Sequence, residues 1–459
     1  MLVRLGQEVQ EVPRRVAPLL LLAGCALLFP VHAAKTSPIV EPQLRSRYIA
    51  LAGDTTVSTT TALLSTTIRL AHRDSVFVEA TGTVAPVAPA SAGSIVATFD
   101  GKPVTSMSTI DWRESFDPVR HTFDVVGATR ASAGQHTVKL VAEPTSGSLA
   151  ISATSNLSVF VHPARTVVAR ALHRAAGPFA FRTYGTSGPD TPHTGLLRAT
   201  VDGRLKTVAL GSASAIRAGH DGDAMIGIYR NGVHPNNATS LWSVNDICTC
   251  AETEAPLITQ AIFGGSGRKR RVVSLDASEF PWSTAQGENP ASYAVDRGAR
   301  LVVLNGVHVA GHARTLGNSF PGASGTATDY LCLASDVGWP GCAPVGTDVL
   351  VAQGSVRIPP GASGVVLFTA KSRVQADNAD AGGTVSTWLT IDGVREGATG
   401  VQELRSPSSV SERTIATSYL SAGSARLQPG PHVVRLYARA DGSFIHVSLV
   451  RDLPVVWFD

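Results

Sequence analysis

Hydrophobic and polar positions alternate with a period of two over many short segments of this chain, and no helical period persists beyond its first 34 residues. Such alternation is typical of antiparallel strands with one buried face. The clearest segment, residues 96–101, ends in Asp100-Gly101, a dipeptide that favours a tight hairpin because Gly adopts positive φ easily. Related segments end at Asp202-Gly203 and Asp392-Gly393. The pattern therefore predicts an all-β chain that uses one unit three times.

A second signature follows the first and the third of these turns. Residues 134–142 match residues 430–438 position by position, and both place a His, a Val, a Leu and an Ala on one face of a strand. The turn Asp precedes His136 by 36 positions (100 to 136) and His432 by 40 (392 to 432). We expect each His to be a hydrogen-bonded residue at a corner of the core rather than a catalytic group.

The middle copy departs from this spacing. Its best sequence counterpart of the second signature is residues 298–304, which places Arg300 98 positions after Asp202 (202 to 300). This spacing of 98 positions exceeds the spacings of 36 and 40 in the other copies, which predicts an insertion of 58 to 62 residues. Loops tolerate long insertions and often carry function, so we expect the functional region there.

These patterns predict three tandem antiparallel β-sandwich domains of jelly-roll or immunoglobulin-like type, the central one with a long disulfide-stapled insertion. The length of 459 residues agrees with this, since one domain takes roughly 150 residues. The expected divisions are a signal peptide at 1–33, a lead-in segment at 34–62, the first sandwich at 63–163, the second at 164–345 with its insertion at about 210–295, and the third at 346–459.

The N-terminal segment is predicted to direct export. Two arginines precede an apolar run at residues 16–29, and residues 31–33 form a small-x-small cleavage site. A membrane-spanning helix needs roughly 20 apolar residues, so we expect no transmembrane segment. The mature chain should begin near Ala34 and be secreted or periplasmic. Lipid anchoring through Cys25 is the alternative, because residues 22–25 resemble a lipobox.

Composition narrows the class of partner. Charged residues make up 16% of the chain, against roughly 25% in an average soluble protein. The net charge of +4 is too mild to predict a nucleic-acid partner. Beyond Cys25, an even number of cysteines in an exported chain favours disulfides over the metal alternative, because their spacing does not match common zinc sites. The predicted disulfide cysteines, with open connectivity, are Cys248, Cys250, Cys332 and Cys342.

Two groups of residues are candidates for ligand binding. The basic run Arg268, Lys269, Arg270 and Arg271 is either a loop that holds an anionic glycan or lipid head group, or a solvated hairpin. Three tryptophans lie in or beside the expected insertion, either as exposed stacking faces or as a small buried core: Trp242, Trp282 and Trp339.

One loop contains the oxygen donors that calcium accepts, namely Asp377, Asn378 and Asp380. A solvated turn is the alternative, because Asp and Asn are common in turns. We predict no cofactor other than this structural calcium.

The predicted function is an exported binding or surface-interaction module for a glycan or another cell-surface ligand. One alternative is a carbohydrate-active hydrolase or lyase whose acids lie in the insertion, and the other is a structural envelope or appendage component. The candidate acids are Asp246, Glu252, Glu254, Asp276 and Glu279. No nucleophile motif is present, so catalysis is not favoured. An exposed platform of Trp and Arg would favour binding, and a pocket with two carboxylates of shifted pKa would favour the enzyme.

Overall fold

The computed structural model describes residues 46–457 except 89, 114–118, 163–165, 178–193, 219–221, 234–238, 245–253, 268, 281–291, 307, 313, 316–329, 335–341, 362–363, 378–382, 405–409, 421–426, 443–445 and 451–453. Within several strands, including residues 239–244, 330–332 and 410–420, only the backbone is described. The described residues contain strands and no helix, and all their pairings are antiparallel, which confirms the all-β prediction. Residues 44–459 form one compact unit.

The first set of strands forms two four-stranded ladders. One has the order β1 (Arg47–Ala50), β10 (Asn156–His162), β4 (Asp74–Pro86) and β7 (His121–Ala131). The other has the order β3 (Thr61–Leu70), β8 (Gly134–Ser146), β5 (Ala92–Phe99) and β6 (Lys102–Asp111). Two short strands, β2 (Thr55–Val57) and β9 (Leu149–Ile151), pair with each other beside them.

The second set repeats this arrangement. One ladder has the order β11 (Val167–Ala171), β19 (Arg300–Asn305), β13 (Thr207–Ala218) and β16 (Glu254–Phe263). The other has the order β12 (Thr194–Asp202), β17 (Arg270–Phe280), β14 (Gly222–Arg230) and β15 (Thr239–Val244). The short β18 (Ser292–Val295) also pairs with β13.

The third set follows the same order again. One ladder runs through β22 (Tyr330–Ala334), β29 (His446–Val450), β24 (Val366–Asp377) and β27 (Val410–Leu420). The other runs through β23 (Val349–Ile358), β28 (Gly430–Gly442), β25 (Gly383–Ile391) and β26 (Val394–Leu404). Three short strands extend these ladders: β20 (His308–His312), β21 (Arg314–Thr315) and β30 (Pro454–Trp457).

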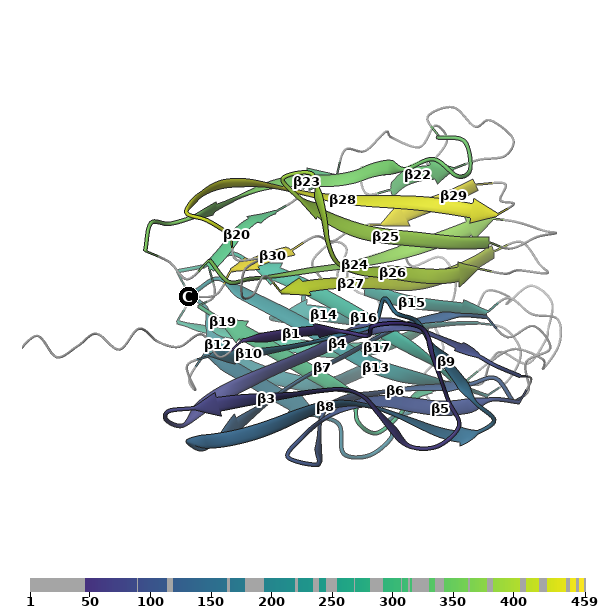
Figure 1. The fold of residues 1–459 in the computed structure, drawn as a ribbon, viewed down its shortest axis with the longest axis horizontal. Helices are drawn as coiled ribbons and strands as arrows, with labels where there is room; N and C mark the ends of the chain where they lie inside the picture. Colours follow the sequence, from purple (N-terminus) through teal and green to yellow (C-terminus); the bar gives the residue numbers. More distant parts are fainter. Residues whose placement is uncertain are drawn as a thin grey trace, which may run out of the picture. The chain divides into compact units, whose positions relative to one another are not determined.

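Figure 1 shows the three sets by colour, the first purple to blue, the second teal, and the third green to yellow. Single residue pairs connect ladders into larger sheets: Thr105 with Gly127, Asp111 with Glu254, and Ser243 with Glu412. Gly127 is required at the first of these crossings. A Cβ there would lie 2.1 Å from the carbonyl oxygen of Val104, so any larger residue would push the two strands apart.

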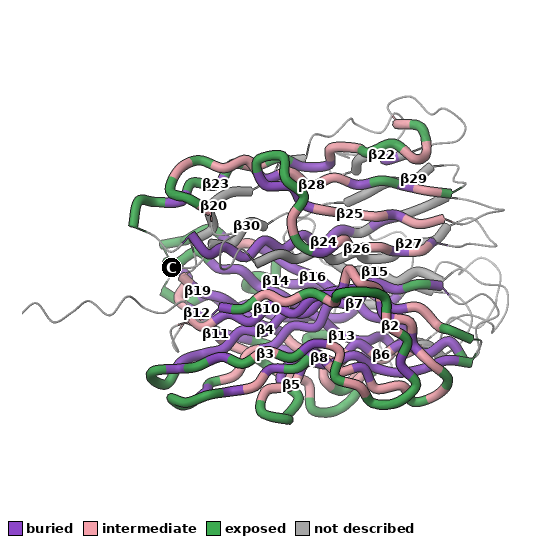
Figure 2. The backbone as a smooth tube through the Cα atoms, in the orientation of Figure 1, coloured by how far each residue is buried: buried purple, intermediate pink, exposed green. Residues whose placement is uncertain are grey.

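Each set of strands has its own hydrophobic cluster, and a fourth cluster lies between the sets. The first contains residues such as Phe123 and Leu140, the second Leu257 and Leu275, and the third Leu389 and Leu436. The fourth draws on all three sets, with Phe77, Val126, Phe160, Val167, Val208, Leu210, Val302, Leu304, Val365 and Leu367. Figure 2 shows strands β4, β7 and β13 buried along most of their described length.

Alternation along β4 explains this double burial. Val76 and Val78 face the cluster of the first set, whereas Phe77 faces the shared cluster. In the same way Phe368 of β24 faces the third cluster and Leu367 faces the shared one. One ladder of each set therefore has both faces covered, and the sets meet through these ladders.

The turns after β5, β14 and β25 are equivalent. Their first residues have positive φ of 48°, 51° and 51°, and each is followed by a Gly of positive φ; they are Asp100, Asn231 and Asp392. The backbone N–H of each of these residues donates to the carbonyl oxygen of a residue on the neighbouring strand, and its side-chain oxygen accepts from the backbone N–H of that same residue. The partners are Thr137, Val272 and Val433. The bonded residues are 37, 41 and 41 positions apart.

This alignment corrects the prediction for the middle copy. Residues 298–304 are not the counterpart of the second signature, because Arg300–Asn305 form β19 between β11 and β13. The counterpart is β17, whose Val273, Leu275 and Ala277 are buried as the matching residues of β8 and β28 are. The spacing is then conserved, so an insertion of about sixty residues is not needed to explain it, and residues 210–295 contribute β13 to β18.

Candidate functional site

The outer face of the ladder β23, β28, β25 and β26 carries two aromatic residues side by side. Trp388 of β25 is the cross-strand neighbour of Tyr437 of β28. Their ring centroids are 6.0 Å apart and the ring planes differ by 11°, so the rings lie nearly parallel. Both residues are half-buried, and neither belongs to the hydrophobic cluster of this set.

The alternation of β28 explains why Tyr437 faces outward. Leu436 and Ala438 on either side of it are buried in the core, so Tyr437 lies on the opposite face. A register shift between Thr387 and Leu389 places Trp388 at a bulge in the pairing of β25 with β26. Bulges commonly redirect a side chain, and here the bulged residue is the aromatic one.

Polar side chains border these rings. The guanidinium carbon of the exposed Arg395 lies 4.7 Å from the centroid of the Trp388 ring, within cation–π range. An N–H of Arg395 donates to Oγ1 of Thr399 at 2.6 Å, which holds the guanidinium in place. We call Trp388, Tyr437 and Arg395 the aromatic platform. It combines flat apolar surface with hydrogen-bond donors, the combination that enriches Trp, Tyr and Arg in binding surfaces.

A second group of interest is an acid cluster where the first and second sets meet. Glu254 of β16 pairs across strands with Asp111 of β6. Burial raises the pKa of Glu254 to about 7, and the nearby carboxylates of Asp296 and Asp111 add to this shift. Arg113 forms an ion pair with the buried Asp111 at 2.5 Å. A carboxyl group that gives up its proton near neutral pH beside other carboxyl groups is an arrangement suited to general acid catalysis.

The two histidines of the second signature are hydrogen-bonded as predicted. Nδ1 of His136 lies 2.7 Å from Oδ2 of Asp100, and its Nε2 lies 2.9 Å from the carbonyl oxygen of Ser132. His432 makes the same contact with Asp392 at 2.7 Å. Burial lowers the pKa of His136, but the bonds to Asp100 and Ser132 outweigh it and raise the pKa above its usual value. These contacts fix the turn against the neighbouring strand.

In the second set, Arg271 occupies the position that corresponds to His136 and His432. Arg271 was predicted as part of an exposed basic loop, but its side chain is buried. It donates to the carbonyl oxygens of Gly203, Leu205 and Gly264 and to Oγ1 of Thr207. Arg271 therefore stabilises loops inside the protein.

The other predicted ligand-binding residues are only partly described. Lys269 and Arg270 are exposed, as a binding loop or a solvated hairpin requires, and Arg268 lies outside the described residues. Only the backbone of Trp242 is described, in β15, and Trp282 and Trp339 lie outside the described residues. Their role in binding stays a prediction.

The predicted disulfide and calcium residues are likewise largely untested. Cys342 is disulfide-bonded. The side chains of Cys248, Cys250 and Cys332 lie outside the described part, so the framework stays a prediction. Asp377 ends β24 with only its backbone described, and Asn378 and Asp380 lie outside the described residues. Across the described ranges, no group of three or more His, Cys, Asp or Glu side chains is arranged to hold a metal ion.

The acids predicted for the hydrolase alternative do not form one described cluster. Glu254 lies in the acid cluster, whose other carboxylates, Asp111 and Asp296, were not singled out from the sequence. Asp276 is buried in β17, away from the described members of that cluster in sequence and sheet. Asp246 and Glu252 lie outside the described residues, and Glu279 is described by its backbone alone. Within the described part of the chain, no helix is long and apolar enough to cross a membrane.

No protein-family model matches this chain, and no curated protein matches it. A solved structure of a peptide-N(4)-(N-acetyl-beta-D-glucosaminyl) asparagine amidase is 7% identical with a TM-score of 0.27, and the match covers 57% of this chain and 96% of that one. The VP2 subviral particle of infectious bursal disease virus is 10% identical with a TM-score of 0.20, covering 88% and 82%. The delta-endotoxin Cry8Ea1 from Bacillus thuringiensis is 7% identical with a TM-score of 0.19, covering 85% and 54%. TM-scores this low carry no argument about this chain.

Proposed function

We propose that this protein is an exported surface protein of three jelly-roll sandwiches that binds carbohydrate through its aromatic platform. The two four-stranded ladders of each set follow the same strand order, and this order supports a double-sheet jelly roll for each set. Export rests on the apolar N-terminal run and its cleavage site. The mature protein is secreted or periplasmic, with lipid anchoring through Cys25 as the alternative.

The observation that carries the binding function is the near-parallel pair of Trp388 and Tyr437, half-exposed on the outer face of a rigid ladder. Pyranose rings present a flat face of C–H groups, which packs on aromatic rings, while their hydroxyl groups remain at the rim. The guanidinium of Arg395 lies over the Trp388 ring and offers N–H donors to such hydroxyls.

The test is affinity electrophoresis of the purified protein through gels that contain single polysaccharides, followed by calorimetric titration of those that retard it. Trp388→Ala and Tyr437→Ala should each weaken binding about 30-fold, because an aromatic contact of this kind is worth roughly 2 kcal/mol. The matched control is Val141→Ala, at the position of the first set that corresponds to Tyr437. It should bind as the wild type does.

Two results would contradict the proposal. One is a polysaccharide that binds with unchanged affinity to both platform variants. The other is the failure of every acidic, neutral and basic polysaccharide tested to retard the wild-type protein.

The acid cluster favours a second candidate function, a carbohydrate-active hydrolase. Its specific observation is the pKa of Glu254, raised to about 7 beside Asp111. Hydrolysis of polysaccharides at pH 6 to 7 that disappears in Glu254→Gln, with platform binding retained, would support it. Unchanged turnover in that variant, or no hydrolysis by the wild type, would eliminate it.

A further inference from the structure

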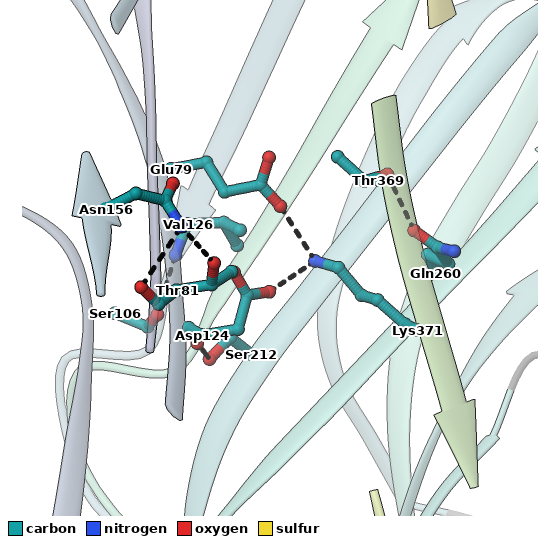
Figure 3. A network of polar contacts seen from close by, with 10 residues as sticks. All are labelled: Glu79, Thr81, Ser106, Asp124, Val126, Asn156, Ser212, Gln260, Thr369 and Lys371. Carbon is teal, nitrogen blue, oxygen red and sulfur yellow. Dashed lines mark hydrogen bonds and ion pairs between the residues drawn. The ribbon is translucent and has the colours of Figure 1, made fainter. Parts of the chain in front are cut away.

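Three ionisable side chains meet where the sheets of the three sets pack together. They are Lys371 of β24, Glu79 of β4 and Asp124 of β7, and their side chains are 2%, 0% and 0% exposed. Figure 3 shows the Lys371 side chain reaching from its own strand to both carboxyl groups. Nζ of Lys371 lies 3.2 Å from Oε1 of Glu79 and is also in direct contact with Oδ2 of Asp124.

The register of the strands brings the two carboxyl groups together. Thr81 pairs with Asp124, so Glu79 and Asp124 are diagonal neighbours on one face of the β4–β7 ladder. That face packs against the third set, where Thr369 and Lys371 follow the shared-cluster side of β24. The lysine therefore arrives from a different set of strands than the two acids.

The surroundings offer little compensation for charge. Apolar residues of the shared cluster, such as Val126, lie beside these groups. Within the described part of the chain, Oε2 of Glu79 and Oδ1 of Asp124 have no hydrogen-bonding partner. Ser212 from the second set donates to the backbone carbonyl of Asp124 rather than to its carboxyl group. An ion pair in such a place gives little net stability, because desolvation offsets the attraction.

Burial also changes which protonation states prevail. It raises the pKa of Glu79 to about 8, so this carboxyl group carries its proton at neutral pH. It raises the pKa of Asp124 as well. In a site that disfavours charge, an ammonium and a carboxylate in contact are close in free energy to a neutral amine and a carboxylic acid.

We propose that Lys371 and Asp124 become joined by an intramolecular amide bond, with Glu79 as the catalytic residue that transfers the proton. The neutral Nζ attacks Cγ of the protonated Asp124, an N–C bond forms, and the carbonyl electron pair moves onto oxygen. Glu79 gives its proton to the departing hydroxyl group and takes up the proton that Nζ loses. The C–O bond breaks with its electron pair on oxygen, one water leaves, and Glu79 ends as it began.

The geometry holds the amine and the carboxyl group in contact, which does not happen for free groups in water. Free amines and acids at neutral pH are both charged and rarely meet, whereas here the two groups are held in contact away from water. Burial lowers the pKa of Lys371, but the neighbouring acids outweigh it and raise this pKa. The neutral pair therefore forms when Nζ passes one proton to the carboxyl group of Asp124, whose own pKa burial raises. Well-oriented intramolecular reactions gain effective concentrations on the order of 10⁵ to 10⁸ M. The product removes the buried charges of Lys371 and Asp124 and fastens β7 to β24, which are 247 positions apart in the chain.

The test is peptide mapping of the reduced and denatured protein by mass spectrometry. Trypsin does not cleave after an acylated lysine, so residues 121–130 should appear covalently joined to residues 358–373. The joined mass should be lower than the sum of the two peptides by one water. The intact chain should show the same loss after reduction.

Two variants serve as controls. Glu79→Gln keeps the size of the side chain and removes the acid, so it should give the two peptides unlinked and an intact mass without the loss. Lys371→Arg keeps a positive charge and removes the amine, with the same expected result. Recovery of residues 121–130 and 358–371 as separate peptides from the folded wild-type protein would overturn the proposal, and so would an undiminished cross-link in Glu79→Gln.

Discussion

Replacing Lys371 by methionine should lower the stability of the protein more than any surface change. The substitution leaves Glu79 and Asp124 as free carboxyl groups in a buried site, with neither an amide bond nor a cation to compensate them, and an uncompensated buried charge costs about 3 to 5 kcal/mol. It also prevents the amide bond, whose loop of 247 positions contributes about 5.5 kcal/mol in the chain-entropy model. The free energy of unfolding should therefore fall by about 8.5 to 10.5 kcal/mol at pH 7 if the two effects add.

A triple variant separates these two contributions. Lys371→Met combined with Glu79→Leu and Asp124→Leu removes the charges together and still lacks the cross-link. It should regain the charge penalty of about 3 to 5 kcal/mol and remain below the wild type by the cross-link contribution. Urea unfolding followed by near-ultraviolet circular dichroism measures all three proteins.

The pH dependence gives an internal check on the single variant. An uncompensated buried acid has a folded pKa above its unfolded value, so its destabilising effect is absent below the unfolded pKa and grows as pH rises. Burial raises the pKa of Glu79 from 4.5 to about 8 even though Lys371 lowers it, so this pKa is higher still without the lysine. Lys371→Met should therefore be closest to the wild type near pH 4.5 and lose stability progressively as pH rises above that value. Stability within about 1 kcal/mol of the wild type at pH 7, or a triple variant no more stable than the single one, would refute this reasoning.

Two further substitutions test the corners where the loops and turns meet the neighbouring strands. Arg271→Ala should cost about 3 kcal/mol in urea unfolding, because it strands buried carbonyl groups, while the exposed Arg270→Ala should change stability by less than about 0.5 kcal/mol; equal effects would contradict the role given to Arg271. Asp100→Asn keeps the oxygen that accepts from Thr137 and loses the ion pair with His136. In the folded protein the pKa of Asp100 is lowered and that of His136 is raised. The variant should therefore lose about 0.5 to 1 kcal/mol of unfolding free energy between pH 4 and 6.5, and this loss should vanish as pH rises through the folded pKa of His136. A loss of stability that persists at pH 9 would argue against this role of the ion pair.

The sequence alone predicted the features that depend on local geometry. The turns at Asp100-Gly101 and Asp392-Gly393 have the expected positive φ, and the strands after them bury the expected face. The middle copy was misaligned because Asp202-Gly203 matches the other turns in letters. Neither of these two residues has positive φ, whereas Asn231-Gly232 has it at both positions. Asn tolerates this conformation as Asp does, so turn geometry was the better guide.

The sequence did not predict the buried contacts between sets. Alternation shows that β24 places Leu367 and Lys371 on one face, but it does not show that another set of strands covers that face. A lysine there is therefore expected to reach solvent. The sequence did not predict the platform for a related reason, because Trp388 lies in the repeated strand itself, where the pattern indicates a scaffold, whereas Trp242, Trp282 and Trp339 lie in or beside the expected insertion.

The most direct test of the binding proposal is oxidative footprinting of tryptophan and tyrosine side chains, with and without a polysaccharide that retards the protein. Trp388 and Tyr437 are half-exposed and should react in the free protein, whereas Trp112 is fully buried and should not. The proposal predicts that ligand protects Trp388 and Tyr437 together and leaves the reactivity of the half-buried Tyr48 of the first set unchanged. Protection confined to other residues, with both platform rings as reactive as before, would contradict it.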